Sequence, residues 1–122
     1  MMRGSPARPL RPRCPHGRLS RLLGKFLPPD LHIAASSLRP WASANFVGAR
    51  HHFTLNWVDT DPHAISPDHN PKRNRQNAMV ARLESQLALI EWPLYQHIVA
   101  DISAQPAPDQ DAILLEILTV EE

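Results

Sequence analysis

The segment HHFTLNWV, residues 51–58, alternates apolar and polar side chains with a period of two. Successive side chains of a β-strand point to opposite faces, so this alternation predicts a strand with one buried and one exposed face. The predicted buried face consists of His51, Phe53, Leu55 and Trp57. Such a strand belongs to a sheet that packs one of its faces on a core.

Three further segments predict strands, at residues 31–36, 95–104 and 112–120. The last of them, AILLEILTV, is apolar on both faces, which is typical of a strand that is central or covered on both sides. Residues 38–44 predict a turn or loop, because Pro40 interrupts the pattern. Gly48 predicts a bulge or bend near the start of the strand around 51–58.

One helix is expected between the two pairs of strands, after a polar loop over residues 59–71. Asn70 and Pro71 are typical of a helix N-cap and first position, and Pro93 predicts an end near Glu91. The apolar positions in this segment follow helical spacing and form one stripe, which consists of Met79, Leu83, Leu87 and Ile90. The helix should therefore lie on the sheet along this stripe.

These elements predict a single α+β domain over residues 28–122. Its order is strand, strand, helix, strand, strand, which gives a small four-stranded antiparallel sheet with one helix packed on one face.

Residues 1–27 predict a disordered basic arm, since they hold seven basic residues, no acidic residue and prolines at short intervals. Within the arm, residues 18–27 have the spacing of a short amphipathic helix. This segment is compatible with membrane contact, with organelle targeting or with docking on the protein's own core. It is also compatible with an extension from an upstream translation start that has no role.

Several classes of protein are disfavoured by composition. Cys14 is the only cysteine, so an intramolecular disulfide is excluded, and no apolar run reaches the length of a membrane span. The four glycines do not cluster, so no phosphate-binding loop is possible, and no catalytic motif occurs. We therefore expect a cytoplasmic protein without a cofactor that is not an enzyme, or an organellar one if the arm is a targeting segment.

Two weak candidate sites remain. His63 and His69, with Asp59 and Asp61, combine the imidazole and carboxylate groups that bind transition metals. Three cations, Lys72, Arg73 and Arg75, occupy the first turn of the predicted helix, where the helix dipole favours anions, so a phosphate or carboxylate site is conceivable there.

The leading hypothesis is a non-enzymatic interaction module that acts as a homodimer or binds another protein. It follows from the apolar strip of Leu114, Leu118 and Val120 on the second face of the last strand, which invites a partner. The alternative is a small enzyme or ligand-binding protein that uses one of the two weak sites. Nucleic acid is a poor candidate partner, because residues 30–122 hold six basic and all twelve acidic residues.

Overall fold

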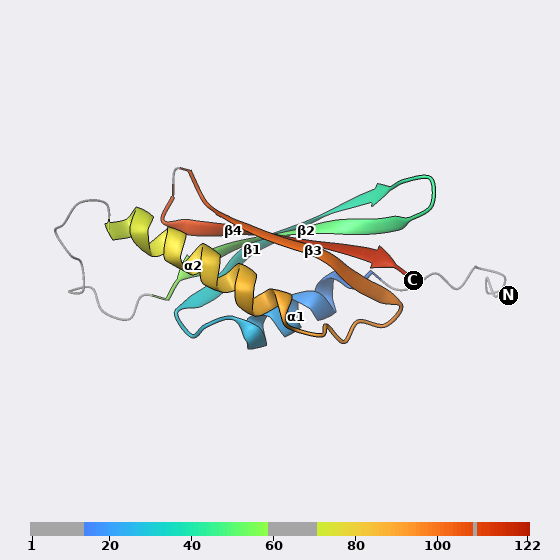
Figure 1. The fold of residues 1–122 in the computed structure, drawn as a ribbon, viewed down its shortest axis with the longest axis horizontal. Coiled ribbons are helices and arrows are strands. Elements are labelled where there is room, and N and C mark those ends of the chain that lie inside the picture. Colours follow the sequence, from blue (N-terminus) through green and yellow to red (C-terminus); the bar gives the residue numbers. More distant parts are fainter. Residues whose placement is uncertain (1–13, 59–70, 109) are drawn as a thin grey trace, which may run out of the picture.

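A computed structural model describes residues 14–58, 71–108 and 110–122 (Figure 1). The elements in chain order are α1 (His16–Phe26), β1 (Leu31–Ala42), β2 (Val47–Trp57), α2 (Pro71–Ala88), β3 (His97–Pro106) and β4 (Ala112–Glu121). The strands form one antiparallel sheet in the order β1-β2-β4-β3. The predicted α+β class and the strand–strand–helix–strand–strand order are confirmed, and α1 precedes that pattern.

The two central strands provide the middle of the core. Phe53 pairs with Leu115, Leu55 pairs with Ile113, and all four side chains are almost completely buried. The strand predicted from AILLEILTV is central, as its apolar residues on both faces required. The pairing of β2 with β4 therefore places the alternating apolar positions of both strands on one face.

Helix α2 lies on this face along the predicted stripe. Met79, Leu83 and Leu87 are buried, whereas Arg82 on the opposite side is exposed. The helix ends at Ala88 rather than near Glu91. The Leu89 and Ile90 amides donate to carbonyls three residues earlier, which tightens the final turn before the chain leaves for β3.

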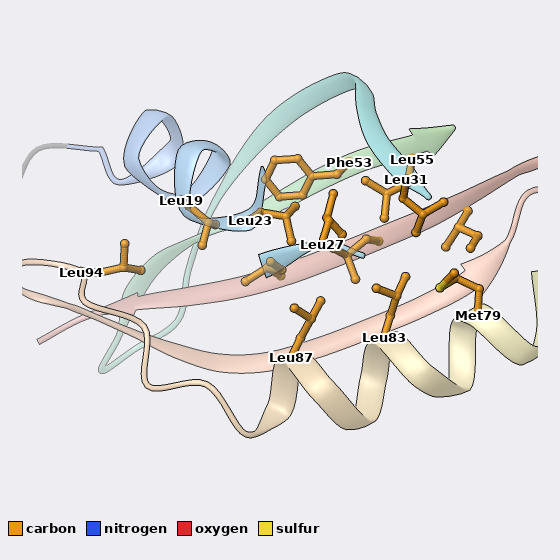
Figure 2. Close-up of a cluster of buried hydrophobic side chains, with 13 residues drawn as sticks. Leu19, Leu23, Leu27, Leu31, Phe53, Leu55, Met79, Leu83, Leu87 and Leu94 are labelled. Carbon is orange, nitrogen blue, oxygen red and sulfur yellow. The ribbon is translucent and has the colours of Figure 1, made fainter. Parts of the chain in front are cut away.

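The structure differs from the expectation of a disordered arm over residues 16–27. These residues form α1 and the turn after it, and Leu19, Leu23 and Leu27 are buried in the same cluster as the α2 stripe (Figure 2). Both helices lie on the same side of the sheet (Figure 1). Docking on the protein's own core is thus the alternative realised by residues 16–27, while residues 1–13 lie outside the described ranges.

The sheet is too wide for one helix to cover, which explains why α1 packs on it. Helix α2 packs against β3 and β4, whereas α1 contacts β1 and stacks His16 against Phe53 of β2. One helix, about 10 Å wide, cannot cover four strands spaced about 4.8 Å apart. The apolar face of α1 covers the half of the sheet that α2 leaves uncovered.

Two local predictions in the first hairpin are wrong. Residues 38–42 belong to β1 rather than to a loop, because Pro40 lies in an edge strand, where a missing amide N–H is tolerated. Gly48 is not a bulge; a Cβ atom there would lie 2.0 Å from the Thr119 carbonyl oxygen, so glycine permits close approach of β4. The irregular positions lie instead between Ile33 and Ala35 and between Val99 and Asp101.

Strand β3 begins two residues later than predicted. Gln96 has a positive φ of 59°, so the chain turns sharply there before the ladder begins at His97.

The packing of both helices predicts the effect of core truncations. Leu23→Ala in α1 and Leu83→Ala in α2 should each lower the free energy of unfolding by about 2–4 kcal/mol, since both side chains are fully buried. Arg21→Ala and Arg82→Ala, at exposed positions of the same helices, should change it by less than about 0.5 kcal/mol. Urea unfolding measures these differences. An unchanged stability of Leu23→Ala would show that α1 is not part of the core.

Candidate binding surface on the uncovered sheet face

The face of the sheet opposite the helices is covered by no described element. We call it the open face. It carries the side chains that alternate with the buried ones, including Arg50, His52 and Thr54 on β2 and Leu114, Glu116 and Leu118 on β4. Because α1 packs on the other face, it leaves the predicted apolar strip uncovered.

Charges on the open face are segregated by strand. The ladder aligns four residues in one row across the sheet, and in strand order these are Arg39, Arg50, Leu118 and Asp101. The two guanidinium groups lie on β1 and β2, and the carboxylate lies on β3 at the far edge. This row therefore runs from positive to negative across the sheet.

The next row contains a side-chain hydrogen bond at its centre. Ser37, His52, Glu116 and Ser103 align across the four strands. The His52 Nε2 atom lies 3.0 Å from Glu116 Oε1, and the other carboxylate oxygen lies 3.6 Å from Arg50 Nη1. The side chains of His52 and Glu116 are 41% and 35% exposed, so both can still contact a partner.

The polar centre of the open face is slightly hollowed. A concavity of about 400 Å³ lies over the middle of the sheet and is bordered by hydroxyl, amide, imidazole and carboxylate groups, including those of Thr54, Gln105, His52 and Glu116. Both donors and acceptors are thus available to whatever covers this face.

One end of the open face is apolar. Trp41, Gly48, Val120 and Ile98 form the row nearest the first hairpin. Ile98 is 49% exposed, and Trp41 and Val120 are half-buried. Together with Leu114 and Leu118 they make the predicted strip wider than the sequence pattern alone indicated.

A second polar cluster lies where α1 meets the sheet and extends from the buried His51 to the exposed Ser36. A hydrogen bond joins the Nδ1 atoms of His16 and His51 at 2.9 Å, so one imidazole N–H donates to the bare nitrogen of the other. The remaining ring nitrogens lie 3.1 Å from the Ser36 hydroxyl and 2.9 Å from the Thr119 hydroxyl. His51 is completely buried and, as the sequence indicated, is a core histidine with hydrogen-bond partners.

This cluster suits neutral imidazoles. Burial, followed by the charges of neighbouring imidazoles with His16 first, lowers the pKa of His51 to about 4. Burial also lowers the pKa of His16. Protonating both rings would place two N–H groups against each other, so the pair is a structural contact that favours neutral and higher pH.

The predicted anion site is only partly described. Arg73 is exposed, and the Lys72 side chain lies outside the described part of the chain. The guanidinium group of Arg75 pairs with the Asp111 carboxylate and stacks 4.1 Å from the centre of the Trp57 ring. The Trp57 N–H donates to the same carboxylate at 3.1 Å. Arg75 therefore joins α2 to the sheet instead of standing with the other cations as a free group.

The predicted metal site, His63, His69, Asp59 and Asp61, lies outside the described residues. Among residues 14–58, 71–108 and 110–122, no group of three or more histidine, cysteine or acidic side chains is arranged to hold a metal ion. Neither of the two described helices has both the length and the apolar character required to cross a membrane.

Comparison of the chain with models of protein families, with curated protein sequences and with solved structures finds no match.

The low pKa of His51 predicts a stability that depends on pH. Between pH 6.5 and about 4, the unfolded chain binds a proton that the folded chain does not, so acidification favours unfolding. The free energy of unfolding should fall by about 3 kcal/mol across this window and change little from this cause at lower pH. Urea unfolding at a series of pH values measures the slope.

The matched variants are His51→Gln, which removes the titrating group, and His32→Gln, which changes an exposed histidine. The first should lose most of the slope between pH 6.5 and 4, and the second should keep it. If His51→Gln kept the wild-type slope, His51 would not be the buried neutral group described above.

Proposed function

We propose that the protein is a non-enzymatic interaction module that forms a symmetric homodimer through its open face. The observation that carries the proposal is the row Arg39, Arg50, Leu118 and Asp101, whose charge changes sign from one edge of the sheet to the other.

A two-fold axis parallel to the strands places the positive end of this row opposite the negative end of the same row in a second copy. When two sheets face each other across such an axis, β1 of one copy lies over β3 of the other, at the same level along the strands. Arg39 then faces Asp101 of the second copy, and the symmetry repeats this pair at the opposite edge. Leu118 faces Arg50, whose aliphatic stem can pack on it.

The neighbouring rows are compatible with the same operation. His52 faces the second copy's Glu116, and Ser37 faces Ser103, so donors again meet acceptors. Trp41 faces Ile98 at the apolar end. The arrangement thus buries the apolar row, pairs Arg39 with Asp101 and His52 with Glu116, and leaves no like charge opposite a like charge.

The size of the open face is adequate. Strands of about ten residues span about 33 Å, and four of them are about 19 Å across, which gives about 600 Å² before side-chain relief is counted. A stable interface buries about 800 Å² of accessible surface on each partner. Nearly the whole face must therefore take part.

The edges of the sheet are less suitable for association. Both edge strands are irregular, β1 between Ile33 and Ala35 and β3 between Val99 and Asp101, and β1 also contains Pro40. Bulges and proline interrupt the backbone groups that a further strand would need. Association through the face is favoured over extension of the sheet.

Charge reversal tests the proposed pairing. Arg39→Asp and Asp101→Arg should each weaken the dimer by at least tenfold, because each places like charges opposite each other twice. The double variant should restore the affinity, since it exchanges the partners of the same pair. Sedimentation velocity over a series of concentrations measures the dissociation constant, and Arg82→Asp on the outer side of α2 is the control that should have no effect.

A monomer at all concentrations would refute the homodimer, and a double variant as weak as the single ones would refute the arrangement. If the monomer instead bound small polar molecules in the concavity, with loss of binding in His52→Ala, the face would belong to the alternative class of ligand-binding proteins.

A further inference from the structure

Helix α1 presents a row of cations to solvent. Arg18, Arg21 and Lys25 are exposed on the side of the helix away from Leu19 and Leu23, and the helix contains no acidic residue. Because the apolar side is fixed in the core, the orientation of the cations is fixed as well.

Exposed apolar side chains occur in the segment that connects α2 with β3, and this segment contacts α1. Leu89 is 85% exposed and Tyr95 is 80% exposed. The guanidinium Nε–H of Arg18 donates to the Pro93 carbonyl at 2.7 Å, and the Phe26 ring packs edge-on against Trp92 at 5.5 Å. The segment therefore runs along α1, as Figure 1 also shows.

We group the exposed residues of α1 and of this adjoining segment under one name, the basic–apolar surface. It consists of Arg18, Arg21, Lys25, Phe26, Leu89 and Tyr95. Phe26 is 39% exposed, so its ring is partly available to a partner. Two acidic residues lie nearby, the exposed Glu91 in the connecting segment and the exposed Glu122, whose amide donates to the Gln96 carbonyl. With the three cations of α1, these side chains have a net charge of +1.

We propose that the basic–apolar surface binds the headgroup region of an anionic lipid bilayer. Lysine and arginine near an anionic bilayer each contribute about 1 kcal/mol of attraction, and tyrosine is enriched at the membrane–water interface. Exposed leucine and phenylalanine can enter the boundary between headgroups and acyl chains. This mode differs from that of an ordinary amphipathic helix, because the apolar side of α1 stays in the protein core.

A phosphate polymer such as RNA could bind the same cations. It would gain little from Leu89, whose side chain neither forms hydrogen bonds nor stacks on a base. The exposed leucine therefore favours the lipid. The inference is independent of the proposed homodimer, because the basic–apolar surface and the open face lie on opposite sides of the sheet.

Co-sedimentation of the full chain with vesicles tests the proposal. Binding is expected with vesicles that contain phosphatidylglycerol and not with vesicles of phosphatidylcholine alone, and it should weaken with added salt. Arg21→Gln/Lys25→Gln should lower the partition coefficient about 30-fold, from two charges at about 1 kcal/mol each. Leu89→Ser/Tyr95→Ser should also weaken binding although it leaves the charge unchanged.

Arg73→Gln is the matched control, since it removes an exposed cation in the first turn of α2, far along the helix from Leu89, and should not alter binding. Circular dichroism confirms that each variant is folded. Absence of binding to anionic vesicles, or an equal loss in Arg73→Gln, would overturn the proposal. So would binding to RNA that depends on Arg21 and Lys25 but not on Leu89.

Discussion

The width of the buried sheet face governs this structure. The apolar side chains of β2 and β4 lie in the middle of four strands, and a single helix covers only half of that width. Helix α2 comes from the connection between the two hairpins, and α1 comes from the segment before them. Leu23 and Leu83 thus enter one cluster from sites that lie far apart in the sequence (Figure 2).

The position of α1 has two further consequences. Its first residue, His16, is brought against the buried His51, so the junction of helix and sheet contains a pair of hydrogen-bonded imidazoles that cannot both be protonated. Its cations are also turned outward, and one of them, Arg18, contacts the segment that carries the exposed Tyr95. With both helices on one side, no described element covers the other side of the sheet, and its charges are ordered by strand.

The sequence predicted the features that depend on the spacing of apolar residues within one segment. Alternation over residues 51–58 and the stripe through Leu83 predicted the central strand and the packing of α2. The sequence did not predict the packing of α1, because a basic amphipathic segment has the same pattern whether it packs on a protein core or binds a membrane. That choice depends on how much of the sheet α2 leaves uncovered.

The candidate surface was predicted only in part, for a similar reason. The strip of Leu114, Leu118 and Val120 follows from a single strand, whereas the row from Arg39 to Asp101 requires the register of all four strands. Part of this row could have been predicted from the first hairpin, because a tight turn near residue 45 pairs Arg39 with Arg50. Pro40 concealed it, because proline suggested a loop where the structure has an edge strand.

Hydrogen exchange followed by mass spectrometry tests the central claim most directly, namely that α1 completes the core of the sheet. Amides of residues 19–26 should exchange as slowly as those of β2 and β4, because local opening of α1 would expose Leu19 and Leu23. Rapid exchange across α1 beside a protected sheet would contradict this account, since it would show that the sheet is stable without its second helix.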